Sequence, residues 1–194
     1  MDSLQLITDR FKENREVTQE TVYLKREILR ATECMVHALK AGKKIIAVGN
    51  GGSAEQASHF VAELAGRFKI DRRPLRALAL GTNLDLLTAV ANDYDFETVF
   101  SRELEAVGEK GDVVLLLSTS GNSKNILRVG EKAHALGVTT IGLTGAKGTL
   151  RERVDIALAI ASSDTPRIQE AHLLIIHIIS ELIEQMIFSD EKSD

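Results

Sequence analysis

The sequence predicts an α/β fold, a doubly wound and mainly parallel sheet of five strands with helices on both faces. Five short apolar runs recur along the chain, and each is nearly continuously apolar rather than alternating. That pattern is typical of strands that are covered on both faces. Segments of helical length separate the runs, and such alternation implies right-handed crossovers between parallel strands. A chain of 194 residues, of which 44% are hydrophobic, suits one domain with extensions.

The first forty residues predict a helical lead. Residues 2–41 contain no proline, and apolar side chains such as Ile28, Met35 and Leu39 recur in them at helical spacing. They can form one long helix or two stacked helices, with Gly42 as the stop. We expect residues 1–41 to be a helical extension that serves oligomerisation, and residues 42–190 to form the domain itself.

Strands and helices alternate after residue 42. The predicted strands are 44–48, 75–80, 112–117, 139–143 and 155–160. The predicted helices are 53–68, 84–91, 95–107, 123–136, a short one near Leu150, and 166–188. Pro166 suits the first turn of the last helix, where a missing N–H costs nothing. This helix is apolar on more than one face, so it must be buried, and burial against another subunit is a natural solution for a small chain.

Composition and charge exclude several classes of protein. The net charge is −4, aromatic residues make up 4% and tryptophan is absent, which disfavours nucleic-acid binding. Cys34 is the only cysteine, so neither an internal disulfide nor a cysteine-based zinc site can form, and a reducing compartment is expected. The N-terminus has no signal pattern, and polar residues interrupt the apolar stretch 173–188. We therefore expect a soluble, cytoplasmic protein without a membrane span.

Two motifs follow predicted strands, where ligands bind in open α/β sheets. The first, GNGGSA at 49–54, has three glycines in four positions, which favours close backbone approach to a small ligand that Asn50 hydrogen-bonds. It is neither a Walker loop nor a GxGxxG fingerprint, which disfavours ATP and dinucleotides. The second, STSGNS at 118–123, offers four hydroxyls and the amides of a helix start, which suit phosphate. A tight polar turn is the alternative for both motifs.

Four side chains on two predicted helices could hold one divalent ion. His59 and Glu63 are four residues apart and so share a helix face, while Gln169 and His177 are eight apart on the last helix. Together they could bind zinc with an open position for substrate. The alternative is a solvated or core histidine, which is commoner for a His–Glu pair at this spacing. His177 is harder to dismiss, because a buried imidazole in the most apolar segment needs a partner.

Five motifs in register carry a resemblance to a known family. They are GNGGSA at 49–54, HFVAE at 59–63, AND at 91–93, STSGNS at 118–123, and RIQEAH at 167–172 with His177. With them, essentially the whole chain resembles the phosphoheptose isomerases of the SIS (sugar-isomerase) domain family. The resemblance implies a flavodoxin-like sheet, a homotetramer with sites at subunit interfaces, and conversion of sedoheptulose 7-phosphate to D-glycero-D-manno-heptose 7-phosphate. That reaction is the first step towards the heptose of lipopolysaccharide or related surface glycans.

The resemblance also implies roles for individual residues. The family's metal ligands match His59, Glu63, Gln169 and His177, and they imply one zinc per subunit. Glu63 and Gln169 are implied to contact substrate as well. The other implied substrate contacts are Asn50, Gly51, Gly52, Ser53, Asn92, Asp93, Ser118, Thr119, Ser120 and Ser123. Of these, Asn92 and Asp93 could equally form a simple turn at the end of a helix.

Moving a carbonyl between C2 and C1 needs a base and an acid on opposite sides of an enediol. We assign Glu63 as the base and His177 as the acid, and the reverse roles stay open. Zinc bound nearby would polarise the carbonyl. A carboxylate tied to a metal is a poorer base, so this assignment requires Glu63 to change its coordination during turnover.

Two other functions compete with this interpretation. One is a non-catalytic, tetrameric SIS protein that binds the bacterial replication initiator, but such relatives lack the full acid/base pair that Glu63 and His177 provide. The other is a sugar-phosphate sensor, or an isomerase of another sugar phosphate. Sensors of that kind usually add a DNA-binding helical domain, and the lead of about 40 residues is too short and too balanced in charge to be one.

Overall fold

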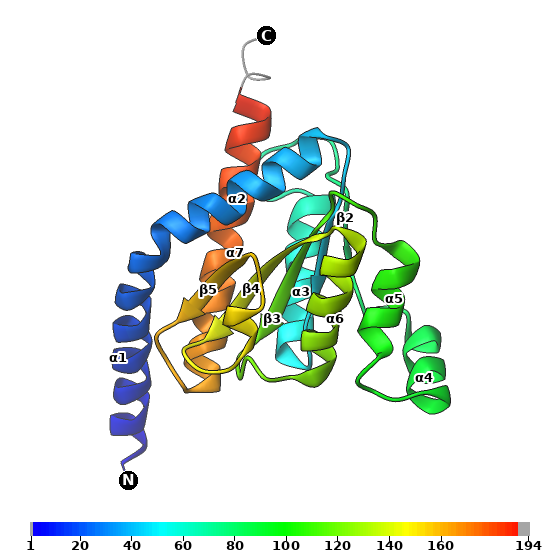
Figure 1. Cartoon of the computed structure of the whole chain (residues 1–194). Helices are drawn as coiled ribbons and strands as arrows, with labels where there is room; N and C mark the ends of the chain where they lie inside the picture. Colours follow the sequence, from blue (N-terminus) through cyan, green and yellow to red (C-terminus); the bar gives the residue numbers. More distant parts are fainter. Residues whose placement is uncertain (1, 190–194) are drawn as a thin grey trace.

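The computed structural model describes residues 2–189 and contains a five-stranded sheet (Figure 1). All strand pairs are parallel and the order is β2-β1-β3-β4-β5, the flavodoxin-like order. The predicted fold class and the five predicted strands are therefore confirmed, while the expected domain end at residue 190 lies outside the described residues. The strands are β1 (Ile45–Val48), β2 (Ala77–Ala79), β3 (Val113–Ser118), β4 (Thr139–Gly145) and β5 (Ile156–Ile160).

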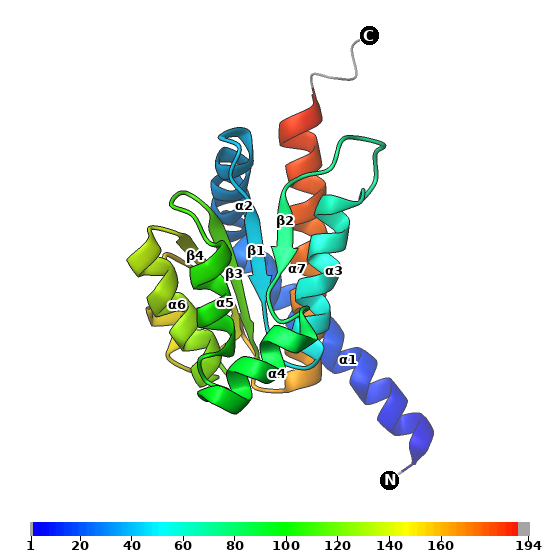
Figure 2. The ribbon, with the colours of Figure 1, turned by 90° about the vertical axis from the view of Figure 1, so that its right-hand side faces the viewer.

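Helices cover both faces of the sheet (Figure 2). Each side has its own apolar cluster, and the side chains of a single strand divide between the two: Ile45 belongs to one cluster and Ile46 to the other. This division explains the continuously apolar strands, because every position of β1 and β3 is buried. The first cluster includes residues of α2 (Lys25–Lys40), α3 (Gly52–Ala65) and α7 (Thr165–Phe188). The second includes residues of α4 (Leu84–Asp93), α5 (Val99–Val107) and α6 (Lys124–Leu136).

The N-terminal lead forms two helices rather than one. α1 (Ser3–Thr21) begins at Asp2, whose side chain accepts a hydrogen bond from the backbone N–H of Leu4. A 3-10 turn, η1 (Val22–Leu24), then leads into α2. α2 packs against the sheet and α7, whereas the beginning of α1 projects away from the rest of the chain (Figure 2).

Two predicted helices are shorter than expected, and tertiary contacts explain both differences. The helix expected over 53–68 ends at Ala65. Gly66 leaves helical geometry with φ −84° and ψ −112°, and the N–H groups of Phe68 and Lys69 donate to Glu184 of α7 instead. The helix expected over 95–107 begins at Val99, because residues 95–98 form a turn in which Glu97 pairs with Lys124 and Arg128 of α6. The short helix expected near Leu150 is the 3-10 turn η2 (Leu150–Glu152).

α7 is long and apolar enough to cross a membrane by those two criteria alone, with a hydropathy of 1.5 over an 18-residue window. Half of that window is buried inside this chain, and its inward face includes the buried polar side chains of His172, Ser180 and Glu184. A helix whose polar groups are satisfied or buried by its own domain is a core helix of that domain. The prediction of a buried last helix is thus confirmed for this part of α7, while Leu174 and Ile178 stay exposed.

Candidate active site

The two predicted ligand loops meet at the point where the direction of winding reverses. β1 and β3 are neighbours in the sheet, but the chain leaves β1 for α3 on one face and leaves β3 for α6 on the other. Such a switch point opens a crevice beyond the carboxyl ends of the two strands. The structure has a hollow of about 580 Å³ here, lined by Asn50, Gly51, Phe96, Glu97, Ser123, Lys124 and Asn125.

The first loop brings backbone close to the site. Gly51 has φ +53°, a left-handed conformation that glycine adopts without strain. At Gly52 a Cβ atom would lie 2.7 Å from Nε2 of Gln169, so a larger residue would displace that side chain. Ser53, at the start of α3, is buried. The three predicted loop residues therefore form a tight start to α3 that faces Gln169 of α7.

Asn50 is tied to a residue that sequence reasoning did not single out. Its side-chain amide donates to Oδ1 of Asn125 at 2.9 Å, and the amide of Asn125 donates back to Oδ1 of Asn50 at 2.9 Å. Each carboxamide keeps one further hydrogen and one further lone pair for a ligand. Asn125 is buried in the first turn of α6, so this reciprocal pair joins the first loop to the second. An asparagine in the first turn of a helix is common, so no local sequence signal singled out Asn125.

The second loop gathers hydroxyl groups at the start of α6. The Ser118 and Ser123 hydroxyls lie 3.2 Å apart, and the exposed Ser120 hydroxyl accepts a hydrogen bond from the backbone N–H of Asn122 at 3.2 Å. Ser123 caps α6 by position, but its side chain makes no capping hydrogen bond. The first N–H groups of α6 are therefore not taken by that hydroxyl, and they can serve an anion at the helix start. Thr119 lies between these serines and anchors the loop, since its carbonyl accepts from Gly145 N–H.

Three predicted ligand residues from α3 and α7 meet in one cluster. Nε2 of His59 lies 2.9 Å from Nε2 of His177 and 3.1 Å from Oε1 of Glu63. All three ligand atoms lie within 4.8 Å of one another, and the three residues are partly buried. Two ligands bound at 2.0–2.1 Å to a tetrahedral zinc ion lie about 3.3 Å apart. The donor atoms and their spacing therefore fit a divalent ion such as zinc.

The fourth predicted ligand faces the first loop, and the predicted sugar contacts lie in another layer of the fold. Gln169 is near the start of α7, eight residues before His177, and its side chain lies against Gly52. Asn92 and Asp93 are exposed at the end of α4, where the amide of Asn92 donates to Asp93 at 2.9 Å. α4 belongs to the layer on the opposite face of the sheet from α3 and α7.

The aromatic ring of Phe68 completes the surroundings of the cluster. It stacks on the His177 imidazole with the ring centroids 5.6 Å apart and the planes 24° apart. His59 meets the same imidazole edge-on, at 5.2 Å and 65°. His177 is thus held between an aromatic face and a second imidazole. Nothing in the spacing of the sequence motifs predicted this role for Phe68.

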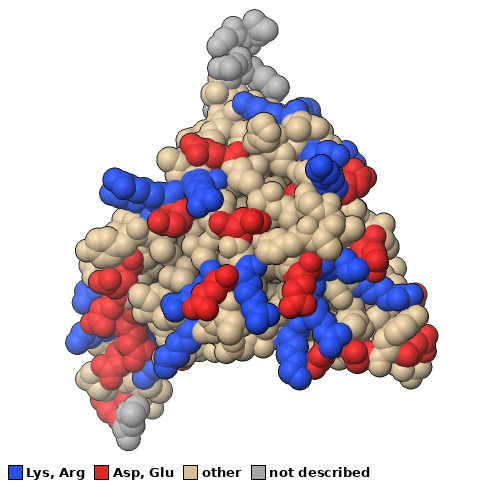
Figure 3. Space-filling view, in the orientation of Figure 1, with Lys and Arg blue, Asp and Glu red and all other residues tan. Residues whose placement is uncertain are grey.

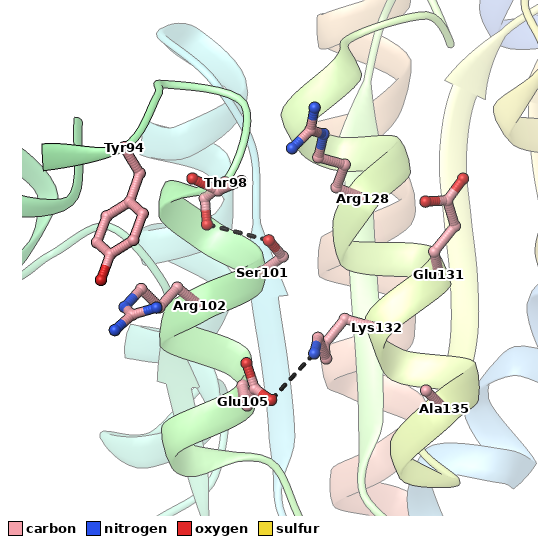
Figure 4. Close-up of a pocket in the computed structure, with 9 residues that line it drawn as sticks. All are labelled: Tyr94, Thr98, Ser101, Arg102, Glu105, Arg128, Glu131, Lys132 and Ala135. Atoms are coloured by element: carbon pink, nitrogen blue, oxygen red, sulfur yellow. Dashed lines mark hydrogen bonds and ion pairs between the residues drawn. The ribbon is translucent and has the colours of Figure 1, made fainter.

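Within the described residues, the face shown in Figure 3 and the groove between α5 and α6 offer no comparable cluster of unpaired polar groups. Acidic and basic side chains are interspersed over the face shown in Figure 3, so no single-sign field covers that face. A groove of about 420 Å³ lies between α5 and α6, but its charged groups already have partners (Figure 4). Lys132 pairs with Glu105 at 3.1 Å, Arg128 with Glu97 at 2.7 Å, and Arg102 lies over the Tyr94 ring at 4.4 Å.

Comparisons with known proteins agree with this geometry. The family model of the SIS domain matches residues 10–145. The chain belongs to the SIS-domain family. Among proteins of this family, it is 48% identical to the phosphoheptose isomerase of Geotalea daltonii over 170 residues, which is 87% of this chain and 88% of that protein. It is 45% identical to the phosphoheptose isomerase of Helicobacter pylori over 182 residues, which is 93% of this chain and 95% of that protein.

A solved structure of the same SIS-domain family shares the whole architecture. The phosphoheptose isomerase from Francisella tularensis superposes with a TM-score of 0.92 at 37% sequence identity. The match covers 95% of this chain and 100% of that one.

Proposed function

We propose that this chain is a phosphoheptose isomerase that converts sedoheptulose 7-phosphate to D-glycero-D-manno-heptose 7-phosphate. The observation that carries the proposal is the convergence of His59, Glu63 and His177 in a chain that is 48% identical to a phosphoheptose isomerase over most of its length. The product would supply the heptose of lipopolysaccharide or related glycans. The single cysteine, which leaves no partner for an internal disulfide, supports a soluble protein that works in the cytoplasm.

In this proposal, Glu63 and His177 move the protons. The Glu63 carboxylate removes a proton from C1 of the open-chain ketose, and the electrons of that C–H bond form the C1–C2 double bond of a cis-enediol. His177 gives a proton to the oxygen on C2 and takes one from the oxygen on C1. Glu63 then returns its proton to C2, which leaves the aldehyde at C1. The partial burial of both residues supports this role, because a proton-transfer pair works best when it is shielded from bulk water yet open to substrate.

We also propose that His59, Glu63 and His177 hold one zinc ion, with Gln169 as a further ligand. Two imidazoles and a carboxylate form a donor set of the kind that catalytic zinc sites use. When bound, zinc would polarise the sugar carbonyl as a Lewis acid. Gln169 lies on the same helix as His177, and its position beside Gly52 supports a contact with both ion and substrate.

The two loops are proposed to bind the rest of the substrate. Ser118, Thr119, Ser120 and Ser123 would bind the phosphate together with the free N–H groups at the start of α6. Asn50, Gly51, Gly52 and Ser53 would contact the sugar next to the cluster, because their loop adjoins Gln169. Asn92 and Asp93 are proposed as sugar contacts at subunit interfaces, since α4 belongs to the other layer of the single chain.

A homotetramer is part of the same proposal. Leu4, Ile7 and Phe11 are large apolar side chains of α1 that are more than half exposed in the single chain. A largely apolar groove of about 500 Å³ lies between the end of α1, the start of α2 and α7, and it is lined partly by Leu174, Ile178 and Leu182. Exposed apolar surface of this extent is typical of subunit interfaces. Residues 1–41 would then serve oligomerisation.

One assay tests the proposed activity. The purified full chain is incubated with sedoheptulose 7-phosphate, and the aldose is detected by its C1 proton signal in NMR. We expect the aldose to form, a chelator to abolish its formation, and added zinc to restore it. Failure of the zinc-loaded protein to form any aldose would overturn the proposed reaction.

A further inference from the structure

The segment that follows α3 folds back onto α7 around one buried carboxylate. Glu184 Oε1 accepts hydrogen bonds from the N–H of Phe68 at 3.0 Å and from Nε of Arg72 at 3.0 Å. Its Oε2 accepts from the N–H groups of Lys69 at 2.9 Å and Ile70 at 3.3 Å. Burial would raise the pKa of Glu184, but these N–H donors and the Arg72 guanidinium outweigh burial and lower it. One side chain of α7 thus fixes three consecutive backbone groups of residues 66–73.

The Arg72 guanidinium fastens the other side of this segment to α3. It donates to the carbonyls of Glu63 at 2.7 Å, Leu64 at 2.8 Å and Gly66 at 3.0 Å. Those carbonyls are at the end of α3, where no further helical turn supplies donors. The Arg72 and Glu184 side chains are 2% and 4% exposed, so the pair is almost fully excluded from water. Arg72 and Glu184 therefore join the ends of the two helices that carry the proposed active-site residues.

This connection places Phe68 on His177. Glu184 and His177 are seven residues apart on α7, close to two helical turns, so both project from the same side of the helix. Because Glu184 binds the Phe68 N–H, the Phe68 ring lies over the His177 imidazole two turns earlier. The stacked ring restricts rotation of the imidazole about its Cβ–Cγ bond. Nε2 of His177 then points at Nε2 of His59.

We propose that Phe68, Arg72 and Glu184 are positioning residues of the active site: the Arg72–Glu184 pair holds the Phe68 ring against His177 and so directs this imidazole towards His59 and Glu63. The inference rests on the proposed isomerase function and deepens it. None of the three needs to touch substrate, because they act through His177. A purely structural staple would need no aromatic ring at position 68, and a buried ion pair contributes little net stability compared with apolar packing.

The test uses two variants of the ring in the full-length protein. Phe68→Leu keeps an apolar side chain but removes the stacking face, whereas Phe68→Tyr keeps the ring. We expect Phe68→Leu to lower kcat at least about tenfold with less than about a twofold change in KM, and Phe68→Tyr to restore most of the loss. Groups that orient metal ligands typically alter metal affinity about 10- to 100-fold, so the affinity for Zn²⁺, measured by competition with a chromophoric chelator, should also fall in Phe68→Leu.

Two further variants examine the ion pair and the segment itself. Glu184→Gln places an amide among N–H donors, and we expect it to reduce kcat and Zn²⁺ affinity in the same direction as Phe68→Leu. Asp71→Ala changes an exposed side chain of the same segment and should leave both quantities unchanged. Wild-type values of kcat and Zn²⁺ affinity in a folded Phe68→Leu protein would overturn the inference. If the wild type binds Zn²⁺ but isomerises no sugar, the proposed reaction fails, whereas a lower Zn²⁺ affinity in Phe68→Leu still supports positioning.

Discussion

At the scale of single residues, the meeting of three polar groups restricts the chemistry. Nε2 of His59 has at most one hydrogen, yet it lies 2.9 Å from a nitrogen of His177 and 3.1 Å from an oxygen of Glu63. A cation relieves this conflict, because all three atoms can then direct lone pairs at it. The same three side chains can thus hold an ion and move protons, so their two roles need separate measurements.

Glu63→Gln and His177→Gln each remove one group that can carry a proton. The first keeps the size of the side chain, and the second keeps a polar group. We expect each to lower kcat about 100-fold or more, because a general acid or base contributes about that much. Steady-state kinetics with zinc content measured in every sample separates a lost proton carrier from a lost ion. Glu27→Gln, an exposed change on α2, is the control. Normal turnover in both site variants would remove the assignment.

Ser120 offers an exposed hydroxyl in the proposed phosphate loop. We expect Ser120→Ala to raise KM for sedoheptulose 7-phosphate about tenfold or more with a smaller effect on kcat, since a hydrogen bond to a charged group contributes about 1.5–3 kcal/mol. A contact with the phosphate, which is remote from the reacting carbons, stabilises the bound substrate and the transition state alike, so its loss appears mainly in KM. With sedoheptulose, which has no phosphate, the wild type and the variant should behave alike. A fall in kcat at constant KM would assign the loop another role.

His172 makes stability depend on pH. Burial lowers the pKa of His172 from 6.5 to about 4, against a smaller opposing effect of the Thr144 backbone. Between these values the unfolded chain binds more protons than the folded chain, so the folded state loses stability as the pH falls from 6.5 towards 4. At pH 5 the free energy of unfolding is lower by about 2 kcal/mol than at pH 7 because of His172. The free energy of unfolding, measured with urea, should decrease between pH 7 and pH 5 by about this much less in His172→Gln than in the wild type. Equal decreases in the two proteins would contradict the assignment.

At the scale of elements, the sequence determined the strands better than the ends of the helices. β1 and β3 are buried at every position, so their residues form unbroken apolar runs that local reasoning detects. α3 ends early because residues 66–73 bind Glu184, more than 100 residues further along the chain. α5 begins late because Glu97 pairs with side chains of α6. Such long-range contacts leave no mark on local periodicity.

In the site too, local spacing could be predicted and long-range contacts could not. His59 and Glu63 could be paired from their spacing, because one helix face brings them together. Joining them to His177 required either the structure or the family resemblance, since 118 residues separate the two histidines. Phe68 and Asn125 escaped notice because an aromatic residue after a helix and an asparagine in a first turn are ordinary locally. Only their contacts reveal them.

Asn125 joins two elements and yields a test at that scale. Asn125→Ala removes both hydrogen bonds to Asn50 and frees the first loop from α6. We expect a loss of about 1–3 kcal/mol in the free energy of unfolding, because a buried polar partner is left without its bond. Binding of sedoheptulose 7-phosphate should weaken as well, since both loops are proposed to contact the substrate. Asn125→Asp keeps the acceptor for the Asn50 amide but places two acceptor oxygens face to face, so calorimetry should show a loss of stability for this variant too. An unaltered Asn125→Ala would contradict a joining role.

At the scale of the whole molecule, the single chain exposes apolar side chains of α1 and keeps two proposed parts of the site on opposite faces of the sheet. α1 projects from the body with Phe11 75% and Leu4 73% exposed, although apolar side chains of that size are normally covered (Figure 2). Asn92 and Asp93 occupy the layer opposite the His59 cluster. Association would cover the first feature, and a neighbouring subunit could bring a second copy of the Asn92–Asp93 pair to the cluster.

Phe11→Glu places a charge on this apolar surface of α1. We expect the proposed tetramer to dissociate into smaller species, which light scattering after size-exclusion chromatography would measure as a lower molar mass. The fold of each chain should persist, because Phe11 belongs to neither of the two apolar clusters. Lys12→Glu introduces the same charge at an exposed polar position of α1 and should leave the mass unchanged. If each site draws on two subunits as proposed, specific activity should fall together with the mass. A fully active Phe11→Glu monomer would show that one chain suffices.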